Sequence, residues 1–207
     1  MVLKVLLMRD GSRLLAGGRD ARRPHSGGLS VSRATVTPRK DEPTVTPDGE
    51  PLEPRIEGLV VRWARGIEDK RGEIVEIYRP SWGLHPDPLA YVYQSSLHPG
   101  AIKGWVCHRL QDDRLFMITG ALRWAFFDDR PESPTRARLN VITFSERNRA
   151  LVIVPRGVYH AVENVGADLA IFINLPTRPY DHGDPDKYRL PLKNDLIPFD
   201  FDDGPGW

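Results

Sequence analysis

The stretch GAIKGWVCHRLQDDRLFMITG, residues 100–120, carries the pattern that decides the fold. Successive side chains of a β-strand point to opposite faces, so Val106 and His108 share one face while Trp105 and Cys107 share the other. We interpret the stretch as a strand that carries a binding site, with an apolar residue at 106 where an ionisable side chain would be most useful.

Short apolar or alternating stretches of the same kind recur from about Ile56 onward. Clusters of turn-forming residues such as HPDP, HPG, SERN and PRG separate them, and none keeps a helical apolar stripe over three turns. We therefore expect an all-β domain, a sandwich or small barrel of the jelly-roll kind. Its strands should lie within residues 58–64, 72–79, 89–97, 101–110, 114–127, 138–145, 150–155 and 169–176, with an irregular tail from Pro176.

The first fifty residues have a different composition. Arginine, glycine, proline, serine and threonine dominate there, without a period of 2 or 3.6. At 207 residues the chain is long enough for one domain of ordinary size. We predict an irregular N-terminal arm over residues 1–53 and a single domain over residues 54–207.

Charge and cysteine content narrow the function classes. Lysine and arginine number 29 against 28 acidic residues, so the net charge of +1 attracts neither nucleic acid nor an anionic membrane. The apolar run at residues 2–8 is far shorter than the roughly 18 residues of a spanning helix. The single cysteine, Cys107, excludes an internal disulfide framework. We expect a cytoplasmic protein whose partner is a small molecule, and neither a nucleic acid nor a membrane.

A second stretch, PRGVYHAVEN at residues 155–164, has a tight turn leading into a strand that carries His160. The two stretches, written G-x5-V-x-H-x3-D…G and P-x-G-x2-H-x3-N, resemble the paired motifs of the cupin superfamily. That resemblance implies a double-stranded β-helix, the jelly-roll barrel of cupins. Barrels of this kind often hold a metal between two imidazoles spaced two residues apart, and here Val106 replaces the first.

A narrower resemblance covers residues 56–200. The segments DKRGEIVEIYRPSW, AIKGWVCHRLQ, DDRPESPT, VPRGVYHAVEN and IPFDF are similar to successive motifs of the dTDP-4-dehydrorhamnose 3,5-epimerase family, a metal-free branch of the cupins. The resemblance implies a homodimer that binds a nucleotide-linked keto-sugar inside each barrel and needs no cofactor. It also implies an isomerisation in which a proton is removed beside the 4-keto group and returned from the opposite face.

The resemblance also implies roles for particular residues. Val106 occupies the place of the family's proton-abstracting histidine, and the aspartate that orients that histidine lies in a C-terminal stretch that has no match here. The family's catalytic dyad is therefore incomplete. The candidate catalytic residues that remain are His160, Tyr180 as the proton donor, and His108.

Substrate binding is assigned to three further residues. Arg71 and Lys103 match basic residues that contact the nucleotide, and Gln111 follows the His108 strand. For Arg71 the alternative is a surface arginine beside Asp69 and Glu73.

Two other functions stay open at the level of sequence. The chain could be a non-catalytic sugar-nucleotide-binding protein that has lost the dyad. It could also be a metal-dependent cupin acting on a small molecule, with His108, His160 and either Gln111 or Asp112 as ligands. The aromatic residues Trp105, Trp124, Phe126 and Phe127 are interpreted as core.

Overall fold

The structure is a computed structural model that describes residues 38–49 and 51–201. Contacts between Cα atoms divide the chain into Met1–Pro43 and Thr44–Trp207. The described part of the first unit, residues 38–43, is exposed and has no regular secondary structure. The predicted arm over residues 1–53 falls largely outside the described residues, so its boundary stays a prediction.

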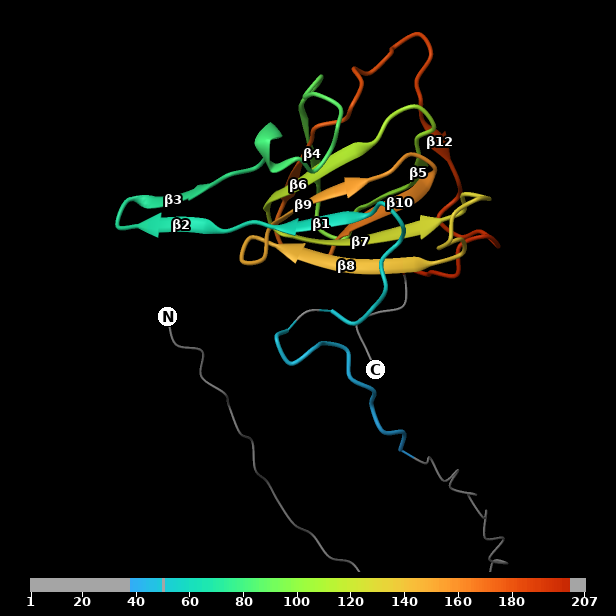
Figure 1. Cartoon of the computed structure of the whole chain (residues 1–207), viewed down its shortest axis with the longest axis horizontal. Helices are drawn as coiled ribbons and strands as arrows, with labels where there is room; N and C mark the ends of the chain where they lie inside the picture. The colour runs from blue at the N-terminus through green and yellow to red at the C-terminus, as the bar shows by residue number, and fades with distance from the viewer. Residues whose placement is uncertain (1–37, 50, 202–207) are drawn as a thin grey trace, which may run out of the picture. The chain divides into compact units, whose positions relative to one another are not determined.

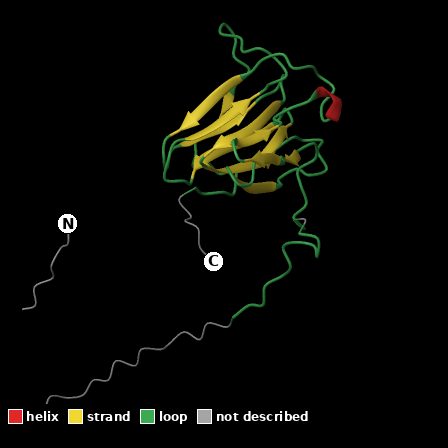
Figure 2. Cartoon of the chain, turned by 90° about the vertical axis from the view of Figure 1, so that its left-hand side faces the viewer, coloured by secondary structure: helices red, strands yellow, loops and turns green. Residues whose placement is uncertain are grey.

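The second unit is built from strands, and its described residues include no α-helix (Figure 1). Figure 2 shows the strands stacked in layers, with one short 3-10 helix, η1 (Pro80–Trp82), at the periphery. The strands are β1 (Val60–Trp63), β2 (Gly66–Asp69), β3 (Gly72–Val75), β4 (Tyr93–Leu97), β5 (Ile102–Cys107), β6 (Asp113–Thr119), β7 (Ala121–Asp128), β8 (Leu139–Ser145), β9 (Ala150–Val154), β10 (Val158–Asn164), β11 (Ala170–Asn174) and β12 (Tyr188–Arg189).

Two five-stranded antiparallel sheets make up the domain. One has the order β1-β9-β6-β11-β4 and the other the order β12-β5-β10-β7-β8, while β2 and β3 form a separate hairpin. Side chains from both sheets meet in one buried cluster that includes Leu115, Trp124, Val152 and Phe172. The apolar inner faces of the two sheets stack on each other and bury this cluster.

The all-β prediction is confirmed, and each predicted stretch contains a strand. The stretch at 114–127 forms two strands, β6 and β7, that turn at Gly120. Strand β2 was not predicted, and neither was β12, which lies in the tail expected to be irregular. None of the described segments forms a helix of the length and apolarity needed to span a bilayer.

Two glycines allow close approach of neighbouring strands. Gly104 has φ +153°, and a Cβ added there would lie 2.2 Å from Cβ of Ala161. The register between β5 and β10 shifts at this point, between His160 and Val162. At Gly120, φ is +89° and an added Cβ would lie 2.7 Å from Cβ of Ala170. Only glycine combines these backbone conformations with the absence of a side chain.

The outer face of the second sheet is covered by residues 197–201. Trp105, which is fully buried, packs with Phe127, Ile197 and Phe201 in a second apolar cluster. The four aromatic residues predicted as core are all buried. Because Trp105 is anchored on this outer side, the alternation along β5 directs Val106 to the inner side.

Candidate functional site

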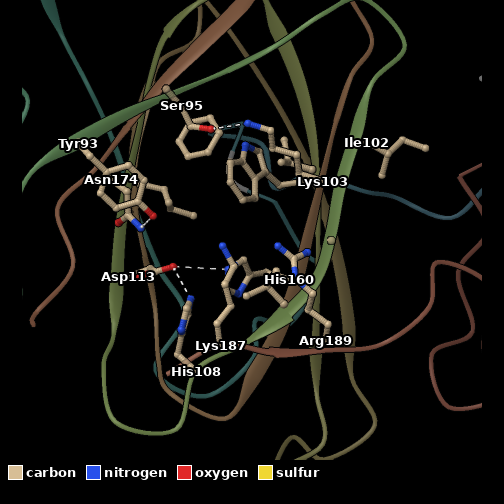
Figure 3. Close-up of a pocket in the computed structure, with 16 residues that line it drawn as sticks. Tyr93, Ser95, Ile102, Lys103, His108, Asp113, His160, Asn174, Lys187 and Arg189 are labelled. Atoms are coloured by element: carbon tan, nitrogen blue, oxygen red, sulfur yellow. Dashed lines mark hydrogen bonds and ion pairs between the residues drawn. The ribbon is translucent and has the colours of Figure 1, made fainter. Parts of the chain in front are cut away.

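A cavity of about 390 Å³ opens inside the barrel, between the two sheets (Figure 3). Strand β5 contributes Lys103 and Val106 to its wall, β10 contributes His160, and β6 contributes Asp113. His108, which directly follows β5, also lines it. The alternation inferred from residues 100–120 therefore brings Val106 and His108 to the same hollow.

At the inner end of the cavity a buried carboxylate faces two imidazoles. Oδ2 of Asp113 lies 3.4 Å from Nε2 of His108 and 3.5 Å from Nε2 of His160. The ring centroids of the two histidines are 5.7 Å apart. Asp113 is 3% exposed, and the Nε2 of Gln111 donates a hydrogen bond of 2.9 Å to its other oxygen. The carboxylate is thus held between two titratable groups.

The orientation of each imidazole is set by a backbone carbonyl. Nδ1 of His108 donates to the carbonyl of Asp186, and Nδ1 of His160 lies 3.3 Å from the carbonyl of Val158. A carbonyl only accepts, so each Nδ1 carries a hydrogen. Nε2 of each ring is then the atom that can gain or lose a proton, or bind a ligand, inside the cavity.

Burial and charge oppose each other in this cluster. Burial alone would raise the pKa of Asp113, but its interactions with His108 and His160 outweigh burial and hold the pKa far below the usual range. For His108, burial alone would lower the pKa, but the interaction with Asp113 and its negative charge outweigh burial and raise the pKa. A charged pair of His108 and Asp113 is therefore favoured near neutral pH.

The same three side chains fit a divalent metal ion. Their ligand atoms all lie within 4.8 Å of one another. Two atoms that each bind one ion at about 2.1 Å, with a tetrahedral angle at the ion, lie about 3.4 Å apart. The distances from Oδ2 of Asp113 to the two Nε2 atoms match this separation. Histidines that bind metals commonly donate their other ring N–H to a backbone carbonyl, as both do here. The residues that would hold the ion are His108, Asp113 and His160, and it would supply Lewis-acid chemistry.

Three cationic side chains, Lys103, Lys187 and Arg189, line the rest of the cavity and are exposed. Nζ of Lys103 donates to Oγ of Ser95 (2.7 Å) and to the carbonyl of Ser96 (2.8 Å). Partial burial, followed by the charge of Arg189, lowers the pKa of Lys187, although Asp113 acts in the opposite direction. The cavity therefore combines a cationic outer part with an inner part made of imidazoles and a carboxylate.

Tyr93 and Asn174 supply neutral polar groups on the opposite wall. Nδ2 of Asn174 donates to the hydroxyl of Tyr93 (2.9 Å). Burial, followed by the negative charge of Asp113, raises the pKa of Tyr93 to about 12. The hydroxyl therefore keeps its proton at neutral pH and can donate it in a hydrogen bond to a ligand.

The other predicted site residues lie outside this cavity. Gln111 holds Asp113, as described above. Tyr180 is 44% exposed and lines a separate hollow of about 150 Å³, where His108 and Gln111 form part of the wall. Arg71 lies in the turn between β2 and β3, where it is exposed and paired with Asp69. The structure brings Lys103, His108 and His160 together in one cavity and places Arg71 and Tyr180 elsewhere.

The carboxylate beside the histidines is Asp113, whereas Asp112 was the carboxylate predicted as a possible metal ligand. Asp112 instead accepts hydrogen bonds from Nε and Nη2 of Arg156 (3.0 and 3.2 Å) and lies 2.8 Å from Nε2 of His85. The available signal was the alternation of β6. Leu115 and Met117 belong to the buried core, and Asp113 shares their face.

Lys187 and Arg189 were also missed. Arg189 belongs to β12 and Lys187 directly precedes it; the strand has only two residues and lies in a Pro- and Asp-rich tail, and no local periodicity marks such a short element.

No family model matches the chain. Two relatives are similar in sequence. The chain is 31% identical over 139 residues to the probable low-salt glycan biosynthesis epimerase Agl13 of Haloferax volcanii, covering 67% of this chain and 89% of that protein. It is 30% identical over 146 residues to the spore coat polysaccharide biosynthesis protein SpsL of Bacillus subtilis, covering 70% of this chain and 96% of that protein.

Solved structures share the fold. A dTDP sugar isomerase from Desulfovibrio desulfuricans superposes with a TM-score of 0.65 at 25% identity, covering 70% of this chain and 90% of that one. A dTDP-4-dehydrorhamnose 3,5-epimerase from Bacillus anthracis superposes with a TM-score of 0.63 at 18% identity, covering 72% and 87%. The second likeness shows the fold alone. Together they confirm the predicted cupin jelly roll.

Proposed function

This chain belongs to the dTDP-4-dehydrorhamnose 3,5-epimerase-like family of cupins, and on that premise we propose that it binds a nucleotide-linked keto-sugar and isomerises it by proton transfer. The observation that carries the proposal is the cavity itself. Its inner end holds His108, Asp113 and His160, and its outer part holds cationic side chains. A sugar at the inner end and a diphosphate near the cations would match both parts.

The cations act locally, since the whole chain has a net charge of only +1. Lys103, Lys187 and Arg189 converge on one cavity. Such a cluster attracts a diphosphate, and a guanidinium can bind two phosphate oxygens at once. We retain Lys103 as a substrate-binding residue. Arg71 is not part of this cavity.

Proton removal is assigned to His160, with His108 as its neighbour. Nε2 of His160 takes the proton from the carbon beside the keto group, and the C–H electron pair forms the C=C bond of an enolate. The carboxylate of Asp113 then stabilises the imidazolium that results, as an aspartate does in other histidine-based sites. In the family's dyad the negative charge comes from an aspartate in a C-terminal stretch. Here Asp113, on β6, supplies that charge instead.

The test is solvent-deuterium exchange. The protein is incubated with a dTDP-4-keto-6-deoxy sugar in D₂O, and NMR follows deuterium entry beside the keto group. His160→Asn should lower the exchange rate by at least about 10²-fold. His182→Asn, in the exposed tail, is the matched control. Measurable binding without any label in the wild-type protein would contradict the enzyme proposal and leave a non-catalytic binding protein.

A metal-dependent cupin is the second candidate. It is favoured by the separations of 3.4 and 3.5 Å between Asp113 and the two imidazoles, and by the carbonyl partners of both Nδ1 atoms. Metal analysis of the purified protein, with His108→Ala as comparison, separates the two. One equivalent of metal, lost in the variant, supports this candidate. Full exchange activity after chelation, without metal, contradicts it.

We also propose a homodimer in the cytoplasm. The β2–β3 hairpin extends away from the sheets (Figure 1), and its cross-strand neighbours Ile67 and Ile74 are 72% and 73% exposed. Paired exposed isoleucines of this kind are typical of a contact surface. Sedimentation should show a dimer that Ile67→Glu weakens, and Glu68→Lys is the control. A wild-type monomer at micromolar concentration would contradict the proposal.

A further inference from the structure

Strand β4 places a tyrosine on the wall of the cavity that belongs to the first sheet. β4 is the edge strand of that sheet, whereas His160 lies on β10, the central strand of the second sheet. Tyr93 belongs to β4 and lines the same cavity as His160. Figure 3 shows Tyr93 and Asn174 on the side of the cavity away from Lys103 and Arg189. A ligand between the two sheets therefore meets Tyr93 and His160 from different directions.

The hydroxyl of Tyr93 is held by a neighbour across the sheet. Asn174 pairs with Tyr93 on one side and with Leu115 on the other. Its Oδ1 accepts a hydrogen bond from the backbone N–H of Arg114 (3.3 Å), and its Nδ2 donates to the Tyr93 hydroxyl (2.9 Å). A turned-over amide would place its NH₂ group against another N–H, so these partners fix the orientation of Asn174.

A hydroxyl oxygen that accepts from Asn174 still has its own hydrogen to donate. Within residues 38–49 and 51–201 that hydrogen has no acceptor. The ring of Tyr91 packs with its centroid 5.6 Å from that of Tyr93 and limits the movement of the side chain. Burial, followed by the charge of Asp113, raises the pKa of Tyr93 to about 12, so the hydroxyl stays protonated. Tyr93 is thus a positioned, uncharged hydrogen-bond donor.

Proton removal beside a keto group needs two groups that approach the sugar differently. The breaking C–H bond must stand across the plane of the C=O group for its electrons to enter the new C=C bond, so the base approaches across that plane. A donor to the keto oxygen prefers to lie near the plane. Two bonds separate the carbon from the oxygen. His160 and Tyr93 come from different sheets and can fill these two positions around one sugar.

We propose that Tyr93 is a catalytic residue whose hydroxyl donates a hydrogen bond to the keto oxygen of the sugar, with Asn174 as its positioning residue. The inference rests on the proposed function. When His160 takes the proton, the C–H electron pair forms the C=C bond and the π pair of the C=O group moves to the oxygen. The hydroxyl stabilises this negative charge and keeps its proton, as a donor in an oxyanion hole does. When a proton returns to the carbon, both electron pairs move back and Tyr93 is unchanged.

This assignment leaves the cationic side chains to the diphosphate. Nζ of Lys103 is held by Oγ of Ser95 and the carbonyl of Ser96. Tyr93 and Asn174 give the sugar a neutral donor that is separate from these charged groups.

The experiment separates catalysis from binding. With a dTDP-4-keto-6-deoxy sugar in D₂O, Tyr93→Phe should lower the deuterium-exchange rate about 10²-fold, as the loss of one oxyanion donor does. Its dissociation constant for dTDP, which has no keto group, should not change. Tyr91→Phe is the matched control, because it removes the hydroxyl of the neighbouring ring, which does not line the cavity. Asn174→Ala should also slow exchange, but not when it is added to Tyr93→Phe, because it acts through that hydroxyl.

The outcomes are distinguishable. Exchange at the wild-type rate in Tyr93→Phe would overturn the assignment and leave the proposed function intact. A loss of dTDP affinity that matches the loss of rate would also overturn it, since Tyr93 would then bind the nucleotide. A further slowing by Asn174→Ala in the double variant would overturn the positioning role of Asn174. Absence of exchange in the wild-type protein would overturn the proposed function, and this catalytic role with it.

Discussion

The carboxylate of Asp113 lies 3.5 Å from Nε2 of His160, deep in the cavity and almost fully buried. The two residues meet although 47 positions separate them in the sequence. The interactions of Asp113 with His108 and His160 outweigh burial and hold the pKa of Asp113 far below the usual range, so the carboxylate stays charged.

Asp113→Asn should lower the free energy of unfolding by about 3 kcal/mol where the pair is charged. The raised pKa of His108 means that its contribution is complete below about pH 6.5 and is lost as pH rises through the raised value. The lowered pKa of Asp113 means that its contribution is present above about pH 4 and is lost as pH falls. The difference between wild type and variant should therefore be largest between these two pH values.

Urea unfolding followed by tryptophan fluorescence at several pH values measures this difference. Asp168→Asn, an exposed residue, is the control. A difference that does not decline at alkaline pH would show that His108 and Asp113 are not a charged pair.

Asp186→Ala should loosen the tail. The variant loses three hydrogen bonds that backbone N–H groups donate to the Asp186 carboxylate. A hydrogen bond to a charged group contributes at most about 1.5–3 kcal/mol to the free energy of unfolding. Amide hydrogen exchange should become faster at Tyr188 and Arg189, which β12 pairs with β5. Asp184→Ala, two residues earlier, should leave these amides protected. Equal protection in both variants would mean that β12 holds the tail without Asp186.

Val106→His should increase the proposed isomerase activity. Residue 106 pairs with His160 on one side and Arg189 on the other, and its side chain faces the cavity. An imidazole there occupies the place of the family's base, so we expect the deuterium-exchange rate to rise by about 10²-fold. Val106→Leu, which changes size without adding a base, should not raise it. Equal rates for the two variants would show that the ligand is bound differently from the family's substrates.

Cys107 should be unreactive in the folded protein. Burial raises the pKa of its thiol to about 11, although the charge of Arg109 acts in the opposite direction. The thiolate is the reactive form and is scarce at pH 8, so a disulfide reagent should react slowly. In guanidinium chloride one thiol per chain should react at once, since Cys107 is the single cysteine. Rapid reaction of the native protein would show that the end of β5 opens readily.

Much of the fold could be predicted from local patterns. Alternation identified β5 and put Val106 and His108 on one face, and the turn at Pro155–Gly157 led to β10 and His160. These inferences hold because the two-residue period of a strand assigns each side chain to a face without knowledge of its neighbours. The hairpin strand β2 was missed because its side chains are all exposed, so it carries no apolar pattern.

The sequence by itself determined the all-β class, the family, and three side chains of the cavity: Lys103, His108 and His160. The tertiary structure alone decided that Asp113 rather than Asp112 completes the histidine cluster, and that the tail brings Lys187 into the cavity. The physical reason is the range of the interactions. Face and turn preferences are local, whereas β12 pairs with β5, and Asp186 binds backbone groups about 76 residues away, through contacts that no local pattern encodes.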